Sequence, residues 1–499
     1  MTSPSTLLDS WLATGFAREL LPLTEILLPT PRQLAAVLVA YRRGAISPQA
    51  TWQLENDLQA LLRELGRLLL QWLFQQAEPA DPAPNPGRLL WAGEVYRRRD
   101  RHPNRIASVF GSFVPWRFLY EPLERGSRSI HPLELRLGVE AGCASAVLAD
   151  RVGQWAAQQP QRGVQAIPRR DHGVVWSCAT LRKVTARLAV GLAERRQEAR
   201  ADKLLALLEQ AFRSRGGRRP VLAVGRDGIH VPLRESLGQE YHEGAVGTLS
   251  VYDRRGQRLG TVYLGRMPEA KQATLSAQLT ALLTEVLGRW HGGRPRLAYV
   301  TDAGWHPTEY FEQVLRRLED PRRPGRRLLW ERIIDFYHAC TYVTRLAEAL
   351  FEDGRMARGW ARRMRRLLKE RHGLTRLLQS ASYHRNQRRL PAAQAKAYES
   401  AYRYLRKRGR FMDYARYRRQ GLPLGSGVTE AACKTVFSQR LKQSGMGWKI
   451  AGGQAIVDLR VIWLSGVWQQ ATQAYREAKP LPYGDTLHDS LPKRPKKAA

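Results

Sequence analysis

Residues 221–228 read VLAVGRDG, an apolar run that ends on Asp227 beside a glycine. Residues 297–304 read LAYVTDAG and repeat this arrangement with Asp302. Each run predicts a buried strand with an acidic residue near its carboxyl end. A third stretch, GSGVTE at 425–430, places Glu430 in the first turn of a predicted helix. Two aspartates and one glutamate of this kind can bind two divalent metal ions once folding has brought them together.

The three acidic residues lie far apart in the sequence, so only tertiary folding can assemble them. A single aspartate at a strand end is usually a turn or cap residue, and that interpretation stays open for each residue alone. Three such acidic residues, two on predicted strands and one on a predicted helix, favour a metal site, because Mg²⁺ takes oxygen ligands and needs few carboxylates. We predict Asp227, Asp302 and Glu430 as catalytic residues and as ligands of two Mg²⁺ ions, for which Mn²⁺ can substitute.

The charge of the chain indicates what such metal ions would act on. Lysine and arginine number 81 against 45 aspartates and glutamates, which gives a net charge of +36. This excess indicates a polyanionic partner, with DNA as the main candidate and an anionic membrane surface as the rival. The most apolar helix candidate, residues 54–74, is interrupted by Arg63, Glu64 and Arg67, so we predict no membrane span.

The sequence also predicts where the protein is found. Its first residues lack the basic start and apolar block of a signal peptide. The four cysteines are far apart, without the spacing of a zinc module, which suits a reducing compartment. We therefore expect a cytoplasmic protein.

The sequence before residue 216 predicts three regions. Residues 1–76 form an N-terminal helical region, and apolar residues recur every three or four positions along one face: Leu54, Leu58, Leu61, Leu65, Leu69 and Trp72. Residues 77–88 are a proline-rich linker. Residues 89–215 begin with a hairpin whose strand at 110–118 alternates in polarity.

The rest of region 89–215 is similar to a helix-turn-helix. A helical piece at 147–152 and a break at 160–168 precede a second, basic helix over 177–196. This arrangement makes Arg182, Lys183 and Arg187 candidates for DNA binding. An ordinary solvated face is the alternative reading of these charges.

Residues 216–351 alternate strands and helices. Three strands in a meander (220–232, 245–253 and 258–264) are followed by a helix over 271–290, the Asp302 strand, a helix over 307–318 and a strand over 328–335. This is the order of the ribonuclease H-like fold. The predicted fold class is α/β (α+β) multidomain, in which a ribonuclease H-like core is interrupted by an all-α insertion and preceded by helical and helix-turn-helix-like DNA-binding regions.

The insertion covers residues 352–422, and the core resumes at 423–475 with the helix that carries Glu430, before a basic tail at 476–499. Arginines and aromatic residues alternate densely in the insertion, which suits a surface that holds phosphates and stacks unpaired bases. For any single arginine an ordinary solvated face remains the alternative. The candidates for DNA binding are Arg362, Arg363, Arg365 and Arg366.

A family resemblance rests on four motifs. They are GRDG at 225–228, TDAG at 301–304, DFYH at 335–338 and the block GSGVTEAACKTVFSQRLKQSGMGWKIAGGQAIVDLR at 425–460. Together they resemble bacterial DDE insertion-sequence transposases of the ISKra type and, more distantly, Mutator-like transposases. The resemblance covers roughly residues 105–470 and implies metal-binding catalytic roles for Asp227, Asp302 and Glu430.

The same resemblance relates Asp335 and His338 to a D/C-x-x-H motif. It implies a role in positioning a strand or in supporting the metal ions, whereas a histidine satisfied at a helix start is the alternative. The family's cysteine pair after the hairpin has no counterpart here, where residues 120–126 read YEPLERG. The sequence therefore supports no zinc site in that region.

The last block adds further candidates. On a helix over 428–442, Lys434 lies one turn from Glu430 and can approach the phosphate that the metal ions hold. Arg440, Lys442 and Lys449 extend this basic track, and Trp448 is a candidate for stacking on an exposed base. Packing against apolar neighbours is the alternative for Trp448.

These features predict a transposase that binds the terminal repeats of its element, cuts DNA and joins the free 3′-OH to target DNA, as a homo-oligomer on DNA. One rival is a catalytically inactive, transposase-derived DNA-binding regulator. The other is a nuclease of the same fold that hydrolyses without joining.

Overall fold

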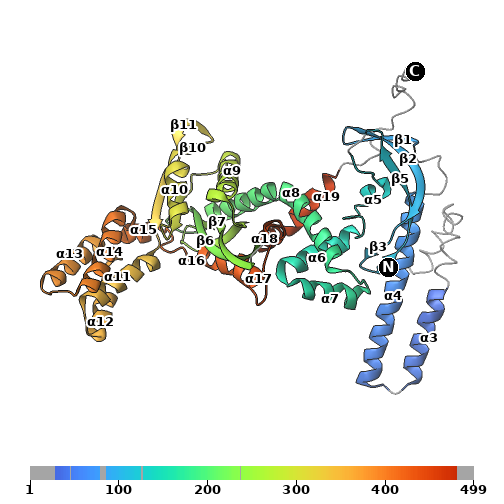
Figure 1. Cartoon of the computed structure of the whole chain (residues 1–499), viewed down its shortest axis with the longest axis horizontal. Helices are drawn as coiled ribbons and strands as arrows, with labels where there is room; N and C mark the ends of the chain where they lie inside the picture. The colour runs from blue at the N-terminus through green and yellow to red at the C-terminus, as the bar shows by residue number, and fades with distance from the viewer. Residues whose placement is uncertain (1–28, 45, 79–85, 125–126, 236–237, 480–499) are drawn as a thin grey trace. The chain divides into compact units, whose positions relative to one another are not determined.

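The structure is a computed structural model that describes residues 29–44, 46–78, 86–124, 127–235 and 238–479. The predicted helical region before residue 29, most of the proline-rich linker and most of the basic tail lie outside these ranges. The fold is mixed α/β (Figure 1). It divides into two compact units, Met1–Leu188 with Tyr475–Ala499, and Ala189–Ala474, and each is considered by itself.

The first unit combines helices with short antiparallel strands. Its elements are α3 (Pro29–Arg43), α4 (Pro48–Ala77), β1 (Arg88–Trp91), β2 (Glu94–Pro103), β3 (Ile106–Ser108), β4 (Gly111–Phe113), β5 (Trp116–Pro122), α5 (Pro132–Arg136), α6 (Ala146–Gln158), α7 (Gln161–His172) and the start of α8 (Cys178–Arg213). Helix α4 begins where Ser47 accepts a hydrogen bond from the Ala50 N–H. The predicted apolar face of α4 is present but only half-buried.

The strand predicted over 110–118 is wrong. The chain forms the β3–β4 hairpin and then a separate strand, β5, with Pro115 in the break between them. Phe113 and Phe118 are buried, whereas Phe110 and Trp116 are exposed. The alternation did not reveal the tight turn, which Gly111 makes possible with a φ of 110°.

The break predicted at 160–168 is also wrong, because α7 occupies it. Pro160 is the N-cap of this helix and Pro168 lies inside it, and Gly173 ends it in the left-handed conformation. The predicted pair of helices is therefore a set of three, α6, α7 and α8. Helix α8 extends well past the predicted end at residue 196.

A five-stranded sheet organises the second unit. Its strand order is β12–β9–β6–β7–β8. The strands are β6 (Val221–Glu235), β7 (Gly238–Tyr252), β8 (Arg258–Arg266), β9 (Arg296–Thr301) and β12 (Trp330–Ile334). β6, β7 and β8 are antiparallel, whereas β9 pairs parallel with β6 and β12 pairs parallel with β9.

Helices connect the strands of this sheet. They are α9 (Ala273–Arg289), after a single turn at Ala270–Gln272, and α10 (Trp305–Gln313), followed by a turn at Leu315–Arg317. The predicted order of strands and helices is present. A small hairpin of β10 (Glu319–Asp320) and β11 (Arg323–Arg327) was not predicted.

The start of β6 explains why the run at 221–224 is apolar throughout. Val221 and Ala223 belong to a core that includes α11 and the helices after it, whereas Leu222 and Val224 belong to a core with α9. Because successive side chains of a strand point to opposite faces, a strand covered on both faces needs apolar residues at every position.

The segment predicted as an all-α insertion is helical. Helix α11 (Phe336–Leu350) leads into α12 (Gly354–Leu367), α13 (Gly373–Asn386), α14 (Ala392–Arg408) and α15 (Tyr414–Gln420). Figure 1 shows α11 to α14 packed together beyond the β12 side of the sheet.

The chain returns to the sheet after this helical segment. The returning helices are α16 (Gly427–Ala432), a π-helical turn (Cys433–Ser438), α17 (Gln439–Leu441), α18 (Ile450–Leu464) and α19 (Trp468–Glu477). Helix α18 packs on β8 and is largely buried. Within the described ranges, no single helix is long and apolar enough to cross a membrane, and only the bent pair α18–α19 meets that length and composition together.

Candidate active site

Two aspartates directly follow parallel strands of the sheet, and a third lies within one, because β6 continues to Glu235 past the carboxyl end predicted at Asp227. Asp302 is the first residue after β9, and Asp335 is the first after β12. Asp227 lies on β6, two residues past Gly225, which pairs with Val300 of β9. The parallel register therefore brings all three to the same edge, as the sequence predicted for Asp227 and Asp302.

Local geometry fixes the backbone around Asp302. Ala303 has a φ of 68°, which is left-handed and unfavourable for a residue with a Cβ. Asp302 Oδ1 accepts a hydrogen bond from the Gly304 N–H at 2.9 Å. Tyr404 of α14 donates its hydroxyl to the Asp302 carbonyl at 3.1 Å. The helical segment between the second aspartate and Glu430 therefore contacts the site directly.

Glu430 reaches the site because its helix lies against β6. A Cβ at Gly225 would lie 2.0 Å from Thr429 Oγ1, so only glycine allows this approach. The Thr429 hydroxyl also lies 2.8 Å from that of Thr248 on β7. Thr429 is buried, whereas Glu430 beside it is exposed. The glycine of the GRDG motif thus has a packing role that the sequence alone did not reveal.

The three carboxylates share one electrostatic environment. Burial raises the pKa of Asp227 to about 6, and the negative charges of Asp302 and Glu430 add to this rise. Hydrogen bonds from the Cys433 thiol to Oδ2, at 3.3 Å, and from the Gly228 N–H to Oδ1, at 2.8 Å, oppose it. Burial and the same acidic groups raise the pKa of the Cys433 thiol, so it remains a donor.

Among the residues that the structure describes, no salt bridge includes Asp227, Asp302 or Glu430. The negative charges of Asp302 and Glu430 disfavour the charged form of Asp227, and a bound cation would relieve this cost. This arrangement suits divalent metal binding.

Ser426 connects Asp335 with Glu430, a link that the sequence analysis missed. Its hydroxyl oxygen lies 2.7 Å from Asp335 Oδ2 and 2.8 Å from Glu430 Oε1. The one hydroxyl proton can be donated to only one of the two carboxylates at a time. Asp335 is fully buried and also accepts from the backbone N–H groups of Ser426 and His338. Asp335 therefore fixes the loop before Glu430 rather than facing the site.

The His338 side chain packs among aromatic residues. Its backbone N–H donates to Asp335 Oδ1 at 2.6 Å, which caps α11. Its ring lies 5.5 Å from the ring of Tyr342 and 5.9 Å from that of Tyr404, and these two tyrosines stack 3.6 Å apart. The D-x-x-H motif thus joins a helix cap to an aromatic cluster beside Asp302.

The donor chemistry of the site fits Mg²⁺, because it offers carboxylate oxygens. The side chains as they stand do not converge on a coordination shell, since no three His, Cys, Asp or Glu residues in the described ranges form a metal-holding group. Asp227 Oδ2 instead accepts from the Cys433 thiol. Metal binding would therefore require a rearrangement of these side chains, for which the exposed Glu430 has room.

The candidates that follow Glu430 separate into two groups. Lys434, Lys442 and Lys449 are exposed, and Lys434 lies in the π-helical turn that follows the helix of Glu430, so the single helix predicted over 428–442 is not continuous. Arg440 requires a correction, because it is only 2% exposed and cannot present its guanidinium to DNA in this structure. It lies 5.4 Å from the centroid of the Trp448 ring, and burial lowers its pKa to about 10. A buried arginine cannot be distinguished from a surface arginine by composition.

Trp448 serves as a packing residue. Its indole N–H donates to the Leu441 carbonyl at 2.9 Å. Its backbone forms hydrogen bonds with Pro232 and Arg234 at the end of β6. With Arg440 over its ring, the half-buried indole is engaged within the protein, which supports the packing alternative over base stacking.

The remaining basic candidates are exposed. Arg182, Lys183 and Arg187 lie on α8, and Arg362, Arg363, Arg365 and Arg366 lie on α12. The opposite face of α12 buries Ala357, Trp360, Ala361 and Met364. A groove of about 270 Å³ between α11 and α12 is lined in part by Arg358, Arg362 and Arg365. The amphipathic pattern of α12 therefore sets its arginines outward.

We expect Asp227→Asn to be more stable than the wild-type protein at pH 8 without metal ions. The pKa of Asp227 lies at about 6 in the fold against a usual 3.8, so folding favours its protonated form. Above pH 6 the charged form of Asp227 therefore lowers the free energy of unfolding by about 3 kcal/mol at most. This loss disappears as the pH falls towards 4. Chemical unfolding of the wild-type protein and the variant, with a chelator present at pH 8 and at pH 4, measures the difference between their free energies of unfolding. Lower stability of the variant at pH 8 would contradict this electrostatic account.

Under the predicted role of Glu430 as a metal ligand, Ser426→Ala should raise the Mg²⁺ concentration that half-saturates the site by about 10- to 100-fold, because residues that support metal ligands typically have effects of that size. The variant loses the hydroxyl that contacts both Asp335 and Glu430. Thr308→Ala, which removes a partly buried hydroxyl bonded to Arg332, is the matched control. An unchanged metal requirement in Ser426→Ala would exclude this positioning role.

The fold and the site define a mixed α/β protein with an acidic cluster at the edge of its main sheet. No protein-family model matches the chain, and no curated protein matches it.

Proposed function

We propose that this protein is a DDE transposase with a ribonuclease H-like core. The observation that carries the proposal is that Asp302 and Glu430 lie near enough to Asp227 for their charges to raise its pKa, beside a sheet in which a three-stranded meander adjoins two parallel strands. The helical segment between Asp302 and Glu430 supports it further, because it contributes exposed arginines and a direct contact to Asp302. The excess of positive charge favours DNA as the partner.

In this proposal Asp227, Asp302 and Glu430 hold two Mg²⁺ ions, or Mn²⁺ in their place. When bound there, such ions activate the attacking oxygen and stabilise the leaving oxygen of a phosphodiester. Ser426 and Asp335 orient Glu430, and the Cys433 thiol must release Asp227 Oδ2 before that oxygen can bind a metal ion. Lys434, four residues after Glu430, contacts a phosphate of the bound strand in this proposal.

The basic surfaces supply DNA binding in this proposal. Arg182, Lys183 and Arg187 contact the terminal repeats of the element, and the arginines of α12 hold the DNA near its cleaved end. The protein acts as a homo-oligomer on the two ends of the element and then on target DNA. Phosphate contacts of this kind position the DNA, whereas base contacts give the sequence preference.

Joining of a pre-cut end tests the proposal. Full-length protein is incubated with Mg²⁺, a labelled duplex that carries the terminal repeat with a free 3′-OH, and a circular plasmid. The expected result is covalent transfer of the label to the plasmid. Hydrolysis without transfer would identify a nuclease, and specific binding without either reaction would identify an inactive DNA-binding regulator.

A further inference from the structure

A small polar cavity lies within the second unit, away from the acidic cluster. It has a volume of about 70 Å³ and is lined by Arg196, Gln197 and Arg200 of α8, Leu264 of β8, and Gln278 and Leu282 of α9. About 10–15 Å³ of space measured in this way is enough for one water molecule. The cavity can therefore hold a small ion together with water.

The positive charge around this cavity exceeds the negative charge. Arg196 is 6% exposed and Arg200 is 3% exposed. Arg196 forms an ion pair with Asp458 of α18. Arg200 forms no ion pair with any described residue, and its Nε and Nη2 atoms have no hydrogen-bond partner there. Two buried guanidinium groups are thus matched by one carboxylate.

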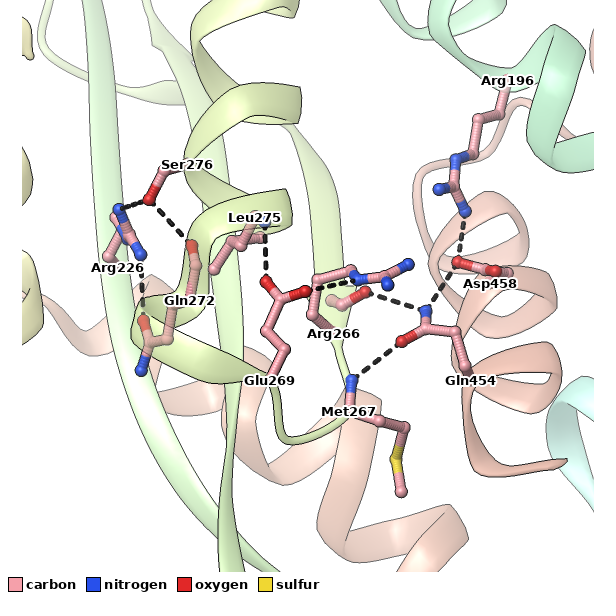
Figure 2. A network of polar contacts seen from close by, with 11 residues as sticks. Arg196, Arg226, Arg266, Met267, Glu269, Gln272, Leu275, Ser276, Gln454 and Asp458 are labelled. Carbon is pink, nitrogen blue, oxygen red and sulfur yellow. Dashed lines mark hydrogen bonds and ion pairs between the residues drawn. The ribbon is translucent and has the colours of Figure 1, made fainter. Parts of the chain in front are cut away.

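Asp458 is not free to neutralise both arginines. Figure 2 shows its carboxylate between the Arg196 guanidinium and the side-chain amide of Gln454, which donates to Oδ1 at 2.8 Å. The same Gln454 accepts from the Met267 N–H at 2.8 Å and donates to the Gly265 carbonyl at 3.3 Å. This network holds Asp458 on the Arg196 side.

Glu285, which contacts a residue that lines the cavity, is also engaged. Gln197 donates its amide to Glu285 Oε2 at 2.8 Å, and Glu285 shares Arg289 with Asp202 in two ion pairs. Arginine does not lose its proton in proteins, so Arg200 remains charged although burial and the charge of Arg196 lower its pKa, an effect that the charge of Asp458 only partly opposes. Water could satisfy its N–H groups but could not neutralise its charge.

We propose that this cavity binds a small inorganic anion of the size of chloride, held by Arg200 and Arg196. The anion accepts hydrogen bonds from the free N–H groups of Arg200 and compensates the second buried positive charge. It thereby anchors the part of α8 that packs on the sheet. This inference is independent of the proposed function.

Thermal and chemical unfolding of the full-length protein in matched sodium salts tests the proposal. In chloride or bromide at ten times the dissociation constant, the unfolding equilibrium constant should be about 11-fold lower than in gluconate, which is too large for the cavity. Arg200→Met should abolish this dependence. Arg213→Met on the same helix, which removes an exposed charge, should retain it. Equal stability of the wild-type protein in halide and gluconate would overturn the proposal, as would the same halide dependence in Arg200→Met.

Anomalous diffraction from wild-type crystals in bromide gives a second measurement that does not depend on the folding of any variant. The expected result is a bromide peak within hydrogen-bond distance of the Arg200 guanidinium. A cavity that contains only water under these conditions would contradict the proposal.

Discussion

Asp227→Asn, Asp302→Asn and Glu430→Gln are each expected to lower DNA cleavage and strand joining by several orders of magnitude. Each substitution keeps the size of the side chain but removes a negative charge on which metal binding depends. Positioning and charge stabilisation by the metal ions supply most of the rate in such reactions. Cleavage of labelled terminal-repeat DNA and transfer to a plasmid measure the loss, and DNA binding should remain intact.

The design of this experiment uses two internal comparisons. Asp253→Asn is the matched control, because Asp253 Oδ1 accepts from the Arg255 and Gln257 N–H groups in a hairpin turn, and an asparagine oxygen can do the same. It should cleave at nearly the wild-type rate. Pairs of the three site substitutions should cost little more than each alone, since loss of one ligand already disables the unit. Near wild-type cleavage by any one of the three would remove that residue from the site.

The second large effect concerns α12. Replacement of Arg362, Arg363, Arg365 and Arg366 by alanine should weaken DNA binding by roughly 10²- to 10⁴-fold at low salt and reduce the salt dependence of binding, because up to four phosphate contacts are lost. The four side chains are exposed, so the fold should persist. Titration of DNA with unpaired ends at several salt concentrations measures both quantities.

A variant with the same change in net charge separates this surface from bulk electrostatics. Replacement of the exposed Arg317, Arg323, Arg326 and Arg327, which lie in and before the β10–β11 hairpin, removes four positive charges elsewhere. It should weaken binding much less. Equal losses in the two variants would show that net charge, rather than the α12 surface, governs the affinity.

Much of the main sheet could be predicted because its signals are local. The apolar runs before Asp227 and Asp302 are buried on both faces of the sheet, so hydrophobicity alone marks them as strands. The turn at Gly256 and the amphipathic helices of residues 352–422 are local signals of the same kind. The placement of Asp227 and Asp302 at one edge then follows from the parallel pairing of β6 and β9.

The unpredicted features depend on contacts between distant residues. Ser426 meets Asp335 across 91 positions, and Cys433 meets Asp227 across 206. Arg440 looks like any other arginine of a basic helix until Trp448 folds over it. Pro160 and Pro168 indicated a break, yet the first is a helix cap and the second lies within α7. In each of these cases the residue type alone does not reveal the role, because the role depends on contacts that form only in the folded chain.

The absence of a side chain at Gly225 has a mechanical consequence. Gly225 precedes Asp227 by two positions, and Thr429, which fills the space above it, immediately precedes Glu430. The approach of the two backbones that carry these acidic residues is therefore set by the β6 backbone contacting the short side chain of Thr429. Any larger residue at position 225 would push α16 away from β6 and move Glu430 with it.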